Sequence, residues 1–229
     1  MKPYQQVPIE ECSEPLVPIP LENFSVTSPH PYEALGAPYG EHSPYFLRQG
    51  VLDRLSQAQD KLRSHHPGWQ LTIFDAYRPI PVQQFMVDYT FAQLAAEEGL
   101  DPVTMEKEER SHIQSQVLKF WAIPSNNPNT PPPHSTGAAI DLTLTDATGN
   151  IVDMGSPIDE VSPRSYPNHF EKAENPEHQK AHHHRSLLAK VMVSVGFRQH
   201  PSEWWHFSWG DQLWAWQTGD SAIARYGKA

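Results

Sequence analysis

The segment that most restricts the fold runs from Pro131 to Asp146 and reads PPPHSTGAAIDLTLTD. Its prolines favour extended backbone, and residues 139–145 alternate between apolar and polar side chains, as a half-buried β-strand does. Gly137, between the two parts, permits a tight backbone turn. A strand therefore begins directly after a turn, and Asp141 lies near its start, where a sheet fixes the direction of a side chain.

The rest of the chain carries both helical and strand patterns, separated by Gly and Pro. Helices are predicted for 46–62, 81–98, 103–121 and 177–196, and further strands for 69–75 and 203–211. The ATGN turn after Asp146 predicts that residues 151–155 return as a hairpin partner of the 139–145 strand. Strict strand–helix–strand alternation is absent, so the predicted class is α+β, a small and mostly antiparallel sheet with flanking helices.

The length of 229 residues suits one domain, which we expect to comprise a catalytic core over 45–229 and an extended N-terminal wrap over 1–44. The wrap is rich in Pro and aromatic residues, and Tyr32, Tyr39 and Tyr45 are interpreted as its packing rather than as site residues. The polar loop at 155–177 is long enough to suggest a functional role.

The charge balance limits the possible partners. The net charge is −10 and no basic run is present, which disfavours nucleic-acid and anionic-membrane surfaces. Cys12 is the single cysteine, so no internal disulfide can form. No window is long and apolar enough for a membrane span, and the first residues lack the apolar stretch of a signal peptide, so we expect a cytoplasmic protein.

Two segments carry residues suited to metal chemistry. His134 and Asp141 lie seven positions apart, and SEWWHF supplies Glu203 and His206. Catalytic zinc takes three protein ligands from His, Asp and Glu and keeps a position for water. His134, Asp141 and His206 would form such a set. A bend at Glu203 would bring its carboxylate beside the bound water as a general base.

Each segment alone also has a simpler interpretation. The chain contains 13 histidines, so chance His–Asp pairs are expected. Paired tryptophans are more often core packing than chemistry. The consecutive His182, His183 and His184 would point about 100° apart on a helix and cannot bind one ion. His169 and His200 are interpreted as surface residues.

Four segments in order resemble a known family. HSTGAAIDLTL and EWWHF, together with FDAYRP and DMGSPIDEVSPRS, resemble the zinc D-alanyl-D-alanine dipeptidases, the VanX-type branch of the D,D-peptidase family. The resemblance extends over about 70–210. It implies a D,D-peptidase/hedgehog-like fold and one Zn²⁺ per chain, held by His134, Asp141 and His206 on the sheet. It places the catalytic base on Glu203 and a carbonyl-polarising arginine on Arg78.

The resemblance also implies how a substrate would bind. It places the contact for the substrate ammonium group on Asp159. Where the family has a serine that helps hold the substrate carboxylate, this chain has Pro132, which has no hydroxyl. Either Ser135 or a backbone amide takes that role, or the C-terminal side of the substrate is recognised differently. The implied activity is hydrolysis of D-alanyl-D-alanine or a close D,D-dipeptide by a metal-activated water.

Two alternatives remain open from the sequence. One is a D,D- or L,D-carboxypeptidase that acts on longer peptidoglycan peptides, which an open groove or a missing Asp159 contact would favour. The other is a non-catalytic zinc-binding interaction module. The presence of both Glu203 and Arg78 argues against the module, because a structural zinc has no use for a base or an oxyanion donor.

Overall fold

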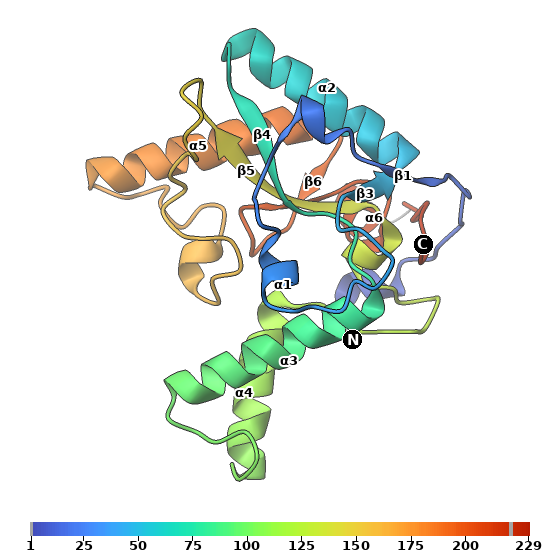
Figure 1. Ribbon diagram of the computed structural model, residues 1–229, viewed down its shortest axis with the longest axis vertical. Coiled ribbons are helices and arrows are strands. Elements are labelled where there is room, and N and C mark those ends of the chain that lie inside the picture. The colour runs from blue at the N-terminus through green and yellow to red at the C-terminus, as the bar shows by residue number, and fades with distance from the viewer. Residues whose placement is uncertain (1, 220–221) are drawn as a thin grey trace.

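The computed structural model describes residues 2–219 and 222–229 and contains one five-stranded sheet in the order β2-β4-β5-β7-β6 (Figure 1). β2 pairs with β4 in parallel and the remaining pairs are antiparallel. The strands are β2 (Ser25–Val26), β4 (Gln70–Asp75), β5 (Ala139–Thr145), β6 (Arg198–Gln199) and β7 (His206–Ser208). With its helices, this sheet confirms the α+β class.

A second, two-stranded sheet joins the N-terminal region to the core. β1 (Leu16–Pro18) pairs antiparallel with β3 (Phe46–Arg48). The predicted helix over 46–62 therefore begins later, as α2 (Gln49–His65), because the first three residues of its apolar pattern form β3. The short helix α1 (Pro31–Ala34) and the 3₁₀ turns Pro3–Gln6 and Leu21–Asn23 complete the N-terminal region.

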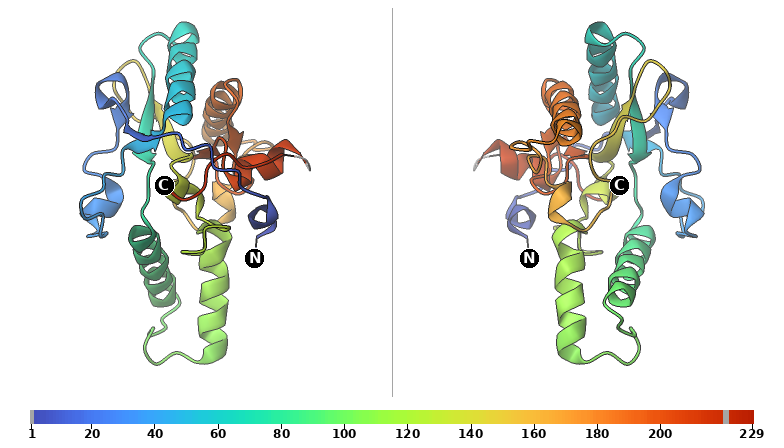
Figure 2. Two further views of the ribbon diagram at one scale, coloured as in Figure 1. Left: turned by 90° about the vertical axis from the view of Figure 1, so that its right-hand side faces the viewer. Right: turned by 90° about the vertical axis from the view of Figure 1, so that its left-hand side faces the viewer.

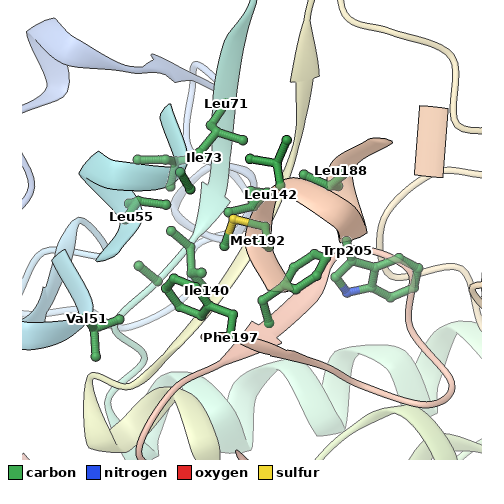
Figure 3. Close-up of a cluster of buried hydrophobic side chains, with 14 of the residues drawn as sticks. Val51, Leu55, Leu71, Ile73, Ile140, Leu142, Leu188, Met192, Phe197 and Trp205 are labelled. Carbon is green, nitrogen blue, oxygen red and sulfur yellow. The ribbon is translucent and has the colours of Figure 1, made fainter. Parts of the chain in front are cut away.

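The main core lies where α2 and α5 (Pro176–Val193) cover one face of the sheet. Figure 3 shows Leu55 of α2, Ile73 of β4, Leu142 of β5 and Met192 of α5 directed toward one another. All seven residues of β5 are buried, so the strand is covered on both faces. The central strand is therefore a rigid support for Asp141.

A second core lies between the antiparallel helices α3 (Ile80–Glu97) and α4 (Lys107–Phe120), which project from the other side of the molecule (Figure 2). α4 begins four residues later than predicted because Glu106 caps it, its backbone N–H donating to the Glu109 carboxylate at 2.8 Å. α6 (Gln212–Thr218) follows β7, and Asp211 caps its N-terminus. Among the described residues, none of the helices has the length and apolar character to cross a bilayer.

Two strand predictions were correct only in part. The turn at 146–150 forms, with the Asp146 N–H donating to the Asn150 carbonyl at 2.9 Å, but residues 151–155 make only an isolated bridge between Ile151 and Thr145. β5 pairs instead with β4 and β7, which are distant in sequence. The predicted strand over 203–211 shortens to β7, because the chain turns before His206.

Candidate metal centre and active-site cavity

The register of the sheet places three chemical groups side by side. Asp141 of β5 lies opposite Asp75 of β4 on one side and opposite His206 of β7 on the other. Directly paired residues on neighbouring strands have adjacent side chains. The fourth group, His134, is in the 3₁₀ turn Pro133–Thr136, which Gly137 ends in the left-handed conformation at φ 72°. Gly137 thus makes the turn that the sequence predicts.

The three predicted metal ligands come together. His134 Nε2 lies 3.2 Å from Asp141 Oδ2 and 3.1 Å from His206 Nδ1, and His206 Nδ1 lies 3.0 Å from Asp141 Oδ1. All three side chains are buried, and among the described residues they form a group able to hold a metal ion. Four tetrahedral ligands at about 2.0–2.1 Å from zinc lie about 3.3 Å apart. The observed separations are close to that value.

The hydrogen bonds behind the two imidazoles fit a metal. His134 Nδ1 lies 2.6 Å from the Ala76 carbonyl, which only accepts, so Nδ1 carries the hydrogen and Nε2 presents its lone pair. His206 Nε2 lies 3.2 Å from the Ser208 hydroxyl, which can accept a hydrogen bond and leave the Nδ1 lone pair free. Metal-binding histidines are oriented in this way. With a carboxylate oxygen beside them, the lone pairs define a cation site.

Glu203 lies beside this centre. The chain turns at 201–203, as the predicted bend requires, and brings Glu203 Oε2 to 3.9 Å from His206 Nδ1. Burial raises the pKa of the Glu203 carboxyl well above its usual range, Asp141 raises it further, and Lys2 lowers it. The interpretation of His200 as a surface residue was wrong, because its side chain is 13% exposed and its Nδ1 lies 3.4 Å from Glu203 Oε1.

Arg78 extends from the loop after β4 into the same site. Its Nε and Nη2 donate to Asp75 Oδ2 at 3.0 and 2.7 Å, Nη2 also reaches Asp141 Oδ2 at 3.3 Å, and Nη1 donates to Gln83 Oε1 at 3.0 Å. The guanidinium carbon also lies 4.9 Å from the ring centroid of Trp121. These bonds fix the guanidinium on the edge of the metal centre.

Asp159 lies half-buried in the cavity wall, in a left-handed conformation at φ 67°. The Tyr32 hydroxyl donates to its Oδ2 at 2.8 Å and accepts from Arg78 Nη2 at 3.2 Å. Burial raises the pKa of the Asp159 carboxyl to about 7, and the Asp141 charge contributes in the same direction, whereas Arg78 and Tyr32 lower it. Asp159 therefore faces the metal centre as a carboxyl group poised near neutrality.

Ser135 lies elsewhere. Its hydroxyl donates to the Arg78 carbonyl at 2.7 Å, and its side chain is buried outside the lining of the metal cavity. Ser135 thus ties the turn that carries His134 to the backbone of Arg78.

The metal centre opens into a cavity with about 510 Å³ of space between its atoms, part of which is open to solvent. Sequence reasoning missed several of its walls, namely Lys2, Tyr4, Gln83, Phe120 and Trp121. It also separated Tyr32 and Tyr39 from the site, although the Tyr39 hydroxyl donates to Asp75 Oδ1 at 3.0 Å. Gln83 could have been suspected, because it is only five residues after Arg78, in the first turn of α3. The remaining walls depend on tertiary packing.

Comparison with known proteins agrees with this geometry. The model of a peptidase family described as D-ala-D-ala dipeptidase matches residues 25–223. The chain belongs to this family. A D-alanyl-D-alanine dipeptidase of Synechocystis is 51% identical over the whole chain and 97% of its own length. Relatives of the same name from Escherichia coli and Enterococcus faecalis are 36% and 34% identical, over 61% and 63% of this chain and 55% and 64% of their own.

Two solved structures are similar at lower levels. VanYB in complex with D-alanine-D-alanine shares 14% identity at a TM-score of 0.44, over 72% of this chain and 71% of its own. The LdcB LD-carboxypeptidase shares 15% identity at a TM-score of 0.46, over 87% of this chain and 69% of its own.

Proposed function

We propose that this protein is a zinc dipeptidase that hydrolyses D-alanyl-D-alanine or a close D,D-dipeptide, with one Zn²⁺ per chain on His134, Asp141 and His206. The observation that carries the proposal is the convergence of these three ligand side chains with Glu203 at 3.9 Å from His206, in one buried cavity. The family membership of the chain supports the same activity.

The division of work follows from the positions of the side chains. When bound, zinc polarises a carbonyl and lowers the pKa of a water molecule to about 7. Glu203 accepts the proton of the attacking water and returns it to the nitrogen of the leaving amine. The burial that raises the pKa of Glu203 favours its protonated form, which is the form needed for the second transfer.

Arg78 acts on the carbonyl oxygen of the peptide bond that is cleaved. Its guanidinium is held by Asp75 before substrate arrives, so it can donate to the developing oxyanion without rearranging. Loss of one such preorganised donor costs about 2.7–4 kcal/mol of transition-state stabilisation.

Asp159 supplies the anion that a free substrate amino group requires. It is partly buried in the cavity wall, so its pairing with an ammonium group is partly shielded from bulk water. A peptide acylated at this nitrogen has no positive charge to offer. Asp159 therefore favours a dipeptidase over a carboxypeptidase acting on longer peptides.

The test is a panel of D,D-, L,D- and L,L-dipeptides and N-acetyl-D-Ala-D-Ala, assayed with and without chelator. We expect cleavage of D-Ala-D-Ala that requires metal and is strongly reduced by N-acetylation. Preference for the acylated substrate would favour the carboxypeptidase. Absence of cleavage of any member by the zinc-loaded protein would favour the non-catalytic module.

A pair of variants tests the base. Glu203→Ala should abolish turnover while metal analysis still finds about one zinc per chain, because Glu203 is not a ligand in this assignment. Glu108→Gln, which changes an exposed glutamate of α4, is the matched control and should retain wild-type activity. Loss of zinc from Glu203→Ala would contradict the assignment.

A further inference from the structure

The N-terminal segment Lys2–Val7 forms part of the cavity wall. Lys2 and Tyr4 both line the cavity, beside Glu203 and Trp121. The family match begins at residue 25, so this wall lies outside the part of the chain that the family description covers. It is a feature of this chain that the family assignment does not explain.

The segment is fixed in place by α6. Gln212 Nε2 donates to the carbonyls of Val7 at 2.7 Å and Gln5 at 3.4 Å. Within the segment, the Lys2 backbone N–H donates to Gln5 Oε1 at 2.8 Å, and residues 3–6 form a 3₁₀ turn. Tyr4 is buried with 6% of its surface exposed. Lys2 is therefore held at the cavity by a folded segment.

Among the described residues, the lysine and arginine side chains that line the cavity are Lys2 and Arg78, and Arg78 is already paired with carboxylates. Arg78 donates to two buried carboxylates, Asp75 and Asp141. Among the described residues, the Lys2 ammonium makes one hydrogen bond, a long one of 3.4 Å to the Trp121 carbonyl, and has no carboxylate within 4.0 Å. Burial lowers the pKa of Lys2, and the more distant Glu203 charge opposes this. Lys2 thus lacks a close anionic partner.

A dipeptide brings two charges into such a cavity. On the proposed function, Asp159 binds the ammonium group, and the α-carboxylate needs a cation with free N–H donors. An ammonium group has three donors on a flexible stem and binds carboxylates as a point charge. We propose that Lys2 binds the α-carboxylate of the substrate and makes the enzyme specific for dipeptides with a free C-terminus.

Lys2 could instead position the Glu203 carboxylate. Kinetics on substrates with and without a free carboxylate distinguish this role from binding of the substrate carboxylate. The kinetics of Lys2→Met are measured with D-Ala-D-Ala and with D-Ala-D-Ala amide, which lacks the carboxylate charge. A hydrogen bond to a charged group corresponds to a change of about 10- to 100-fold. We expect KM for the free dipeptide to rise by about this factor, with kcat changed little and the amide affected by less than about threefold.

Two further lysine variants serve as controls for Lys2→Met. Lys107→Met changes an exposed lysine on α4 and should leave both substrates unaffected. Lys2→Arg should keep part of the preference for the free dipeptide over the amide that Lys2→Met loses. Equal losses of kcat on both substrates in Lys2→Met would place Lys2 on Glu203 and overturn the proposal, as would an unchanged KM. A wild-type enzyme that cleaves no dipeptide would overturn the proposed function itself.

A second variant tests the docking of the segment without changing its charge. Gln212→Leu removes the hydrogen bonds to Val7 and Gln5, together with one to the Asn129 carbonyl at 3.0 Å, and should raise KM for the free dipeptide by a smaller factor than Lys2→Met, with the amide again spared. A Gln212→Leu enzyme that keeps the full preference for the free acid would contradict a role for the docked segment. Thermal unfolding of each variant checks that the fold is retained.

Discussion

Replacement of Asp75 by Asn should damage both stability and catalysis, although Asp75 touches neither metal nor substrate. The Asp75 carboxylate is fully buried and accepts two hydrogen bonds from Arg78, one from the Tyr39 hydroxyl at 3.0 Å and one from His30 at 3.2 Å. Asn keeps the shape of the side chain but removes the charge. Arg78 is then left with Asp141 as its remaining carboxylate partner among the described residues.

The size of the effect follows from these contacts. Removing one partner of a buried ion pair destabilises a protein by about 3–5 kcal/mol. The Asn side chain can still accept one of the guanidinium bonds, so the lower end, about 3 kcal/mol, applies. For a domain of this size each kcal/mol shifts Tm by about 2–4 °C. The expected loss is therefore about 6–12 °C, together with a fall in kcat of at least about tenfold, because Arg78 is no longer held against the oxyanion.

The assay is thermal unfolding followed by circular dichroism, with kinetics on D-Ala-D-Ala at a temperature where both proteins are folded. Asp60→Asn, an exposed aspartate on α2, is the control and should change Tm by less than about 2 °C. An Asp75→Asn protein that unfolds within about 2 °C of wild type and retains its kcat would refute the argument that Asp75 holds Arg78.

Three further outcomes are expected. A metal present at 100 times its Kd contributes about 2.7 kcal/mol, so chelation should lower Tm by about 5–11 °C, and an unchanged Tm would contradict the metal centre. Asp159 binds an ammonium group only when ionised, and burial raises its pKa to about 7 in the metal-free protein, so KM for D-Ala-D-Ala should rise as pH falls below about 7, with the midpoint moved to lower pH by the bound cation, whereas Asp159→Asn should show a flat profile. Ser135→Ala should lower kcat a few-fold with KM unchanged, because the hydroxyl binds the Arg78 carbonyl. A rise in KM confined to substrates with a free carboxylate would instead assign the carboxylate to Ser135.

The sequence was informative where chemistry and local geometry coincide. His134, Gly137 and Asp141 lie in one short segment, so their turn and strand could be read from residue types alone. The bend at Glu203 was an assumption, because an extended strand would place Glu203 and His206 on opposite faces. The full set of metal ligands and the base came from the resemblance of the separate segments to the family, and the structure brings these side chains together.

Predictions that needed long-range pairing were weaker. The turn after β5 has the local signals of a hairpin and does form, yet its second arm makes a single bridge to Thr145. β5 pairs instead with β4 along one edge and β7 along the other, and the local alternation of apolar and polar residues does not show which strand will be the neighbour. Lys2 was missed for the same reason, since the folding of a distant segment brings it into the cavity beside Glu203. His200 is only three residues from Glu203, and the turn between them brings the two side chains together.

The charges in and beneath the cavity connect these findings. Four carboxylates lie there, on Asp75, Asp141, Asp159 and Glu203, against the two fixed cations Arg78 and Lys2. With neutral histidines and every carboxyl ionised, two negative charges are left, which one divalent cation cancels. Asp141 is the neighbouring charge that most raises the pKa of both Asp159 and Glu203. A cation on Asp141 therefore weakens that repulsion and favours ionised Asp159 and Glu203, the forms that bind an ammonium group and accept a proton.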